Sequence, residues 1–99
     1  MTTEDGFILI LYRIYEDTPY QSDGQHKRTI YCQHGFLSSA DEWIINMPDR
    51  APGFIAASAG YDVWLGNSRG NRYSRNHTEF SIKSDEFWDW SFEELGMFD

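Results

Sequence analysis

The sequence predicts an α/β fold of about three strands with crossover helices, in a sheet that is incomplete. Runs of β-branched and aromatic residues alternate with helix-like stretches, as in the βαβ units of a mostly parallel sheet. The predicted helices are too few to cover both faces of such a sheet. The last helix signal begins only a few residues before Asp99, so we expect residues 1–99 to form a single partial region of a larger domain.

Composition limits the function. The chain has 99 residues, a formal net charge of −8 and 17% aromatic residues. This balance excludes a strongly basic nucleic-acid surface, while the aromatic content is typical of a folded core rather than of a disordered chain. A single cysteine, Cys32, excludes an intrachain disulfide. We find no transmembrane segment, and residues 1–5 lack the features of a signal peptide.

The first half of the chain predicts two strands. The run FILILYRIY at residues 7–15 is apolar on both faces, and RTIYCQ follows at 28–33. Between them lies a polar loop at 16–27 that contains the turn dipeptide Asp23-Gly24. Because no helix separates the two strands, we expect them to pair antiparallel.

Helix signals begin after the second strand. Ser39 and Glu42 have capping-box spacing, which predicts a short helix that Pro48 ends. A second helix is expected to begin near Pro52 and to end at Gly60.

The remaining elements are a strand at 61–65, a polar irregular segment at 67–83, and a final helix opened by a second capping box, Ser91 with Glu94. We expect the acidic residues from Asp85 to Asp99 to form a solvated face and to favour helix starts.

The second strand ends in His34-Gly35 and leads into an apolar, Ser-rich loop. Acyl transfer places negative charge on a carbonyl oxygen, and backbone N–H groups held at such a turn stabilise that charge. We therefore predict the Phe36 N–H as an oxyanion donor, with His34, Gly35 and Leu37 as the supporting loop. The alternative is an ordinary turn in which the histidine is satisfied by hydrogen bonds.

The run Gly66-Asn67-Ser68-Arg69-Gly70 fits the G-x-S-x-G nucleophile elbow, but its context does not. An elbow leads straight into a helix, whereas residues 71–76 lack helical periodicity. The 34 residues from His34 to Ser68 also correspond to one βαβ unit of roughly 30 residues, not to two. We interpret Ser68 as a decoy, with Gly66 and Gly70 shaping a loop in which Arg69 donates hydrogen bonds.

Other candidates are weaker. Cys32, His34 and His26 lack a fourth ligand and the usual spacing of a zinc site, so we predict no metal and no cofactor. Asn76-His77-Thr78 is a glycosylation sequon, which is meaningful only in the secretory pathway.

Taken together, these segments resemble the N-terminal part of the acid lipase family of α/β-hydrolases, the group of lysosomal acid lipase and gastric lipase. The matching stretches occur in the family's order and span nearly the whole chain. They are residues 2–9, 33–39, 59–71, 73–75 and 85–92.

The resemblance implies hydrolysis of carboxylic esters of lipids, such as triacylglycerols or cholesteryl esters, by a Ser-His-Asp triad in a lysosomal or secreted enzyme. Of the catalytic elements, only the Phe36 amide carries over, at a position where the family commonly has Leu. In the family the catalytic serine lies on a later strand, which implies that this chain alone is inactive and needs the missing C-terminal part of the fold.

Two alternatives from other classes remain. One is a compact esterase that uses Ser68 with His77 or His34 as its base. The other is a non-catalytic interaction module whose aromatic side chains, such as Trp43, Trp64 and Trp88, bind a partner chain.

Overall fold

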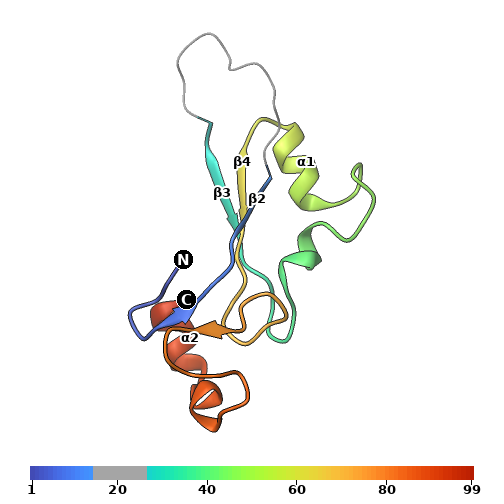
Figure 1. Cartoon of the computed structure of the whole chain (residues 1–99). Helices are drawn as coiled ribbons and strands as arrows, with labels where there is room; N and C mark the ends of the chain where they lie inside the picture. The colour runs from blue at the N-terminus through green and yellow to red at the C-terminus, as the bar shows by residue number, and fades with distance from the viewer. Residues whose placement is uncertain (15–26) are drawn as a thin grey trace.

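The structure is a computed structural model that describes residues 1–14 and 27–99. Its main sheet has three strands: β2 (Tyr12–Ile14), β3 (Thr29–Cys32) and β4 (Asp62–Leu65). The order is β2-β4-β3, with β4 antiparallel to β2 and parallel to β3 (Figure 1). The last of the three strands in sequence is therefore the central strand.

The predicted antiparallel pairing of the first two strands is wrong, because β4 lies between them. The chain from β3 to β4 passes through two helices, and this crossover lets the two strands run parallel. The predicted Asp23-Gly24 turn lies outside the described residues.

Helix α1 (Pro52–Ser58) covers one face of the sheet, and its predicted position is confirmed. Proline at its first turn fits a helix start, and Gly60 after its end has a φ of 93°. The first core forms between α1 and the sheet. Its buried members are Ala40, Ala57, Val63 and Leu65, and partly buried apolar residues pack around them.

The opposite face of the sheet is polar and aromatic, because successive residues of β4 point to alternate sides. Asp62 and Trp64 lie on this face, where Arg13 forms an ion pair of 2.7 Å with Asp62 and stacks 5.1 Å from the Trp64 ring centre. One face of the sheet is therefore packed against α1, and the other is more exposed.

The first predicted capping box is wrong. The segment forms a 3-10 helix, η1 (Ala40–Trp43), without a side-chain cap. Ser39 instead donates to Asp41, and Glu42 accepts the Gly35 N–H at 3.0 Å. Glu42 is thus used by the loop before the helix rather than by the helix start.

The long strand predicted at 7–15 is interrupted. Only β1 (Phe7–Ile8) and β2 have strand pairing. Between them, the Ile10 N–H donates to Ser74 Oγ at 3.0 Å and the Ile10 carbonyl accepts from Asn67 Nδ2 at 3.1 Å. Side chains of a distant loop therefore replace the strand ladder, which the residue pattern at 7–15 does not reveal.

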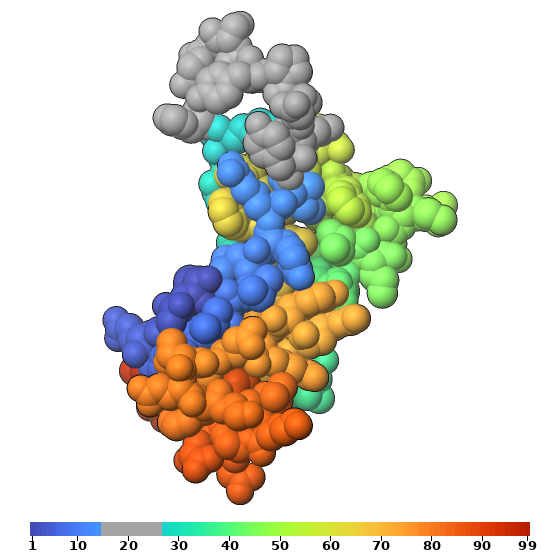
Figure 2. Space-filling view, in the orientation of Figure 1, coloured from blue at the N-terminus to red at the C-terminus, as the bar shows by residue number. Residues whose placement is uncertain are grey.

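A second core forms around β1. This strand pairs antiparallel with β5 (Asn76–His77), a strand that the sequence did not predict. Phe7, Leu9 and Phe87 are buried together, with Phe87 supplied by the 3-10 helix η2 (Asp85–Trp88). Figure 2 shows the blue N-terminal segment lying against the orange residues that carry β5 and η2.

The last helix, α2 (Phe92–Phe98), confirms the second capping box. The Ser91 N–H donates to Glu94 at 2.7 Å, while the Glu93 N–H donates to Ser91 Oγ at 3.2 Å. The hydrogen bonds from Ser91 lower the pKa of Glu94. Within the described residues, no helix has the length and apolar character needed to cross a membrane.

Replacement of Leu65 tests the first core. Leu65 is 1% exposed, and we expect Leu65→Ala to lower the free energy of unfolding by about 2–5 kcal/mol, because it removes packed methyl groups and leaves a cavity. Urea unfolding measures the change. The matched control is Ile55→Ala in α1, where the residue is 49% exposed, and it should cost about 0.5 kcal/mol or less. Equal effects of the two substitutions would contradict the assigned core.

Candidate functional site

The loop after β3, residues 34–38, forms a tight turn, and we call it the His-Gly loop. The Ser38 N–H donates to the Gly35 carbonyl at 3.1 Å, which closes the turn. Leu37, at the third position of this turn, has a φ of 64°, a left-handed conformation that is costly for a branched residue. Backbone strain of this kind is often found at functional sites. The side chains of Phe36 and Leu37 are 64% and 91% exposed.

The loop's amides differ in their use. The Gly35 N–H donates to Glu42, as described above. The Phe36 N–H has no acceptor among the residues that the structure describes. The turn therefore presents a backbone donor that an incoming oxygen atom can engage.

His34 ties the His-Gly loop to the loop after β4. Its Nε2 atom accepts the Ser68 N–H at 3.1 Å, with Asn71 Nδ2 also 3.1 Å away. Because Nε2 is an acceptor, the ring proton belongs on Nδ1, which lies 2.7 Å from the Gly35 carbonyl oxygen. Both ring nitrogens of His34 are thus engaged: Nε2 joins the two loops, and Nδ1 bonds within the His-Gly loop.

Ser68 lies beside this bridge but has none of the partners of an activated serine. Its Oγ accepts a hydrogen bond of 2.7 Å from Gln33 Nε2, and no histidine nitrogen of the described residues bonds to it. The chain continues from Ser68 into a turn at 69–70 rather than into a helix.

His77 is also fully engaged. Its Nδ1 atom accepts the Glu79 and Phe80 N–H groups at 3.0 and 3.1 Å, so Nε2 carries the proton and donates to the Asp5 carbonyl at 2.9 Å. Neither histidine proposed as a base for a compact esterase therefore has a free nitrogen directed at Ser68.

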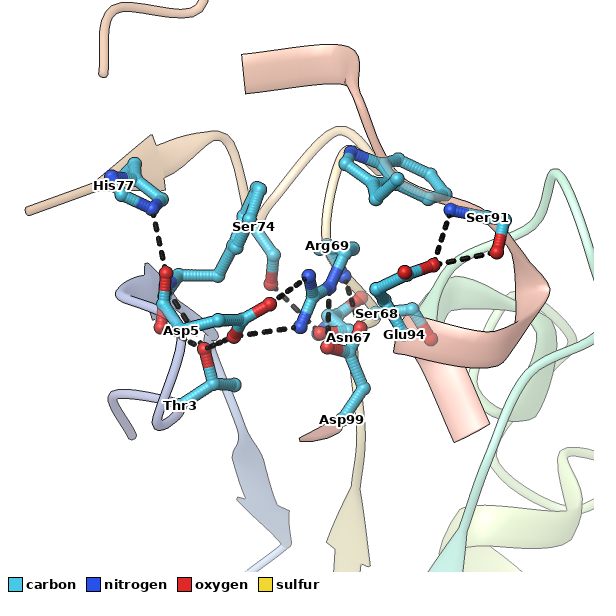
Figure 3. A network of polar contacts seen from close by, with 12 residues as sticks. Thr3, Asp5, Asn67, Ser68, Arg69, Ser74, His77, Ser91, Glu94 and Asp99 are labelled. Atoms are coloured by element: carbon cyan, nitrogen blue, oxygen red, sulfur yellow. Dashed lines mark hydrogen bonds and ion pairs between the residues drawn. The ribbon is translucent and has the colours of Figure 1, made fainter. Parts of the chain in front are cut away.

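Arg69 is buried and pairs with two carboxylates from distant parts of the chain (Figure 3). Its guanidinium donates to Asp5 at 2.6 and 3.0 Å and to Asp99 at 2.7 Å, while its backbone N–H donates to the second oxygen of Asp99 at 2.7 Å. The Phe7 ring lies 4.1 Å below the guanidinium carbon. We call Arg69, Asp5 and Asp99 the arginine network.

The arginine network corrects two predictions. Arg69 bonds to the two ends of the described chain rather than within its own loop. Asp99, predicted to lie on a solvated acidic face, has a side chain that is only 6% exposed. Sequence spacing gives no signal for either contact, because 64 and 30 residues separate the partners.

The network shifts the pKa values of its members. Burial alone favours the neutral forms, but the hydrogen bonds outweigh it. The bonds from Arg69 and Thr3 lower the pKa of Asp5, and those to Asp5 and Asp99 raise the pKa of Arg69. The charged states are therefore the ones that the fold stabilises.

Two asparagines in the same loop complete the packing of polar groups. Asn67 Oδ1 accepts the Ala40 N–H at 3.0 Å, and its backbone carbonyl accepts Ser74 Oγ at 2.8 Å. Asn71 Oδ1 accepts the N–H groups of Tyr73 and Ser74. No structural role was predicted from the sequence for either asparagine. Their spacing of four residues in a Gly-rich loop was the one available signal.

A groove of about 900 Å³ separates the His-Gly loop from the C-terminal segment. Phe36 and Phe92 of α2 approach across it, with ring centres 4.7 Å apart. Trp88, which the interaction-module alternative names, lies on its wall and is exposed, whereas Trp43 and Trp64 are half-buried. No three His, Cys, Asp or Glu side chains of the described residues are grouped in a way that holds a metal ion.

Comparison with known proteins gives consistent matches. The family model described as a partial alpha/beta-hydrolase lipase region matches residues 1–47. Human lipase member J is 50% identical over 100 residues, which is 100% of this chain and 27% of that protein. Human lysosomal acid lipase/cholesteryl ester hydrolase is 45% identical, covering 98% and 24%, and mouse gastric triacylglycerol lipase is 50% identical, covering 100% and 25%.

The chain thus spans about a quarter of the length of these curated relatives. The predicted resemblance to the acid lipase family is confirmed, since the family model describes a lipase region and the relatives are named as lipases. The α/β class of the fold is confirmed with it.

Removal of the buried cation tests the arginine network. We expect Arg69→Ala to cost about 3–5 kcal/mol of unfolding free energy, because it leaves two carboxylates facing each other without their partner. The control is Arg72→Ala in the same loop, a 67% exposed side chain paired with Asp41, which should cost about 0–1 kcal/mol. Urea unfolding at neutral pH compares them, and similar losses would argue against the network.

The pH dependence of stability tests Asp5 separately. Its pKa is lowered in the fold, so its contribution is present above the unfolded value of about 3.9 and is lost as the pH falls through the lower folded value. We expect the stability difference between wild type and Asp5→Asn to be constant from neutral pH to about pH 5 and to shrink below about pH 4. Asp49→Asn, at a 76% exposed carboxylate, is the control and should show no such trend. A pH-independent difference for Asp5→Asn would contradict the charged pairing.

Proposed function

We propose that this chain, which resembles the acid lipase family over its whole length, is the oxyanion-bearing part of a hydrolase that cleaves carboxylic esters of lipids. In this proposal residues 1–99 form one partial α/β-hydrolase region. The nucleophile, its base and its acid belong to polypeptide outside these residues, so the chain alone is inactive.

The Phe36 N–H, which has no acceptor among the described residues, is the observation that carries the proposal. Attack on an ester converts the carbonyl oxygen into an anion, and a rigidly held amide stabilises that anion without reorganising. The Phe36 amide lies in a turn closed by the bond from the Ser38 N–H to the Gly35 carbonyl. Gly35, the residue before it, is fixed by its N–H donating to Glu42 and its carbonyl accepting from His34. A donor that is fixed in place and has no partner among the described residues fits an oxyanion hole.

The bonding of the two described histidines supports assigning the nucleophile elsewhere. A serine nucleophile needs a base within about 3 Å of its hydroxyl. The Ser68 hydroxyl accepts from an amide instead, and both His34 and His77 use their nitrogens in structural bonds. Ser68 therefore acts in loop packing in this proposal.

The groove supports a lipid-like substrate. Aromatic and aliphatic side chains line much of it next to the Phe36 amide, including Leu37, Trp88, Trp90, Phe92 and Leu95. The names of the relatives specify triacylglycerol and cholesteryl ester as substrates, and lysosomal and gastric settings. We propose a lipid ester for this chain and a lysosomal or secreted location.

In the proposed reaction the chain contributes one step. A serine from outside these residues passes its proton to its base and forms a bond to the ester carbonyl carbon, and the oxygen gains negative charge as the tetrahedral intermediate forms. The Phe36 N–H donates to that oxygen in the intermediate. The bond weakens again when the carbonyl reforms, as the ester C–O bond breaks and the alcohol leaves with the proton from the base. His34 and Glu42 hold the turn but do not touch the reacting atoms.

A chimera tests this role. In the chimera, residues 1–99 of this chain are substituted for the matching quarter of mouse gastric triacylglycerol lipase. We expect the purified chimera to hydrolyse a triacylglycerol. Phe36→Pro removes the N–H at a turn position that favours proline, so kcat should fall about 10²–10³-fold, the usual loss for one oxyanion donor. Phe36→Leu keeps the N–H and should retain kcat.

Thermal unfolding shows whether the three chimeric proteins are equally folded. A folded chimera without activity, or a Phe36→Pro chimera with full activity, would refute the oxyanion role. The isolated chain gives a further check. It should neither turn over an ester nor label at Ser68 with a fluorophosphonate, and labelling that Ser68→Ala abolishes would favour the compact esterase.

A further inference from the structure

We propose that Asn76 is a site of N-linked glycosylation. The proposal rests on the proposed function in one respect, since the modification requires the secretory route that a lysosomal or secreted enzyme takes. It does not depend on ester hydrolysis, and it is tested without measuring activity.

The sequence contains one acceptor triplet. The chain has four asparagines, and only Asn76 is followed at the second position by Ser or Thr, with His rather than Pro between them. The other three, Asn46, Asn67 and Asn71, are followed at that position by Pro, Arg and Tyr. A glycan can therefore attach at one place in these residues.

The fold leaves both reactive members of the triplet exposed. Residues 76 and 77 form β5, where side chains alternate between faces. His77 faces inward, with its ring 4.7 Å from the Phe7 ring. Asn76, the preceding residue of the strand, therefore points to the outer face, and Asn76 and Thr78 are both exposed.

The hydrogen bonds separate Asn76 from its buried neighbours. Asn67 Nδ2 donates to the Ile10 carbonyl at 3.1 Å, and Asn71 Nδ2 donates to Asn67 Oδ1 at 2.8 Å, so a glycan on either would break the loop. The Asn76 amide forms no side-chain hydrogen bond with any described residue. Substitution on its nitrogen therefore breaks no side-chain hydrogen bond among the described residues.

The backbone around Asn76 is nevertheless ordered. Asn76 pairs with Ile8 across the β1–β5 ribbon, and the Thr78 N–H donates to the Gly6 carbonyl at 2.9 Å (Figure 1, orange arrow). A glycan at this position extends from a fixed point on the outer face. Residues 76–78 do not line the groove beside Phe36, so the sugar leaves that groove open.

The covalent step is a glycosyl transfer. Asn76 Nδ2 attacks the anomeric carbon of a lipid-linked oligosaccharide diphosphate and forms an N-glycosidic bond. The bond from that carbon to the diphosphate oxygen breaks, the lipid diphosphate leaves with the bonding electrons, and Nδ2 loses one proton. The transferase recognises the Thr78 hydroxyl, so both side chains of the triplet are required.

The experiment expresses the full chain behind an added secretory leader in a eukaryotic cell line. We expect the protein to run with the mass of one added N-glycan, which peptide-N-glycosidase removes. The same enzyme converts a glycosylated Asn76 to Asp, and mass spectrometry should detect this in the tryptic peptide 76–83, which is bounded by Arg75 and Lys83.

Three variants make the result specific. Asn76→Gln and Thr78→Ala should abolish the mass shift, while Thr78→Ser should keep it. Because transfer occurs as the chain enters the lumen, protein that is retained in the cell is as informative as protein in the medium. Lumenal chain without a shift, or a shift that survives Asn76→Gln, would overturn the proposal. Either of these two results would overturn only the glycosylation proposal. The proposed function would still stand if the chimera hydrolyses the ester.

Discussion

The structure depends on a buried guanidinium that joins three segments remote in sequence. Arg69 follows β4, Asp5 precedes β1, and Asp99 follows α2, and their contacts bring all three together. A charge removed from water is costly unless carboxylates and hydrogen bonds replace the lost solvation, and here two carboxylates and an aromatic face do so. The second core, around Phe7 and Phe87, is small, so this directional pairing specifies how the ends of the described chain pack.

The loop that carries Arg69 explains why a nucleophile-like motif has a structural use. Gly70 has a φ of 78°, and a side chain there would meet Trp88 and Trp90, so glycine is required by both backbone and packing. The asparagines on either side satisfy backbone groups that no helix or strand pairs. The G-x-S-x-G spacing here belongs to a tight polar loop. His34 accepts a hydrogen bond from the backbone N–H of Ser68 and forms none with the Ser68 hydroxyl.

The parts predictable from sequence were those fixed by local chemistry. Proline at the start of α1 and the reciprocal bonds of Ser91 with Glu94 depend on residues within one turn, so their patterns were sufficient. The position of β4 between β2 and β3 was not predictable by the same reasoning, because pairing of consecutive strands is only a default and a crossover chain overrides it. The capping role predicted for Glu42 was wrong because its carboxylate accepts the N–H of Gly35, a contact outside the helix start.

The contrast between the amides of the His-Gly loop bears on what chemistry the loop can perform. A turn that serves only as a connection gains stability when each N–H finds an acceptor, as Gly35 does with Glu42. Phe36 lacks such an acceptor among the described residues, while Leu37 beside it holds a left-handed φ that costs about 1–3 kcal/mol. Surrounding bonds from His34 and Ser38 maintain this arrangement. The strained backbone of Leu37, next to a Phe36 N–H without an acceptor among the described residues, fits a loop that binds an anion. The ring nitrogens of His34 and His77 are already hydrogen-bonded, which does not fit a role in activating a serine nucleophile.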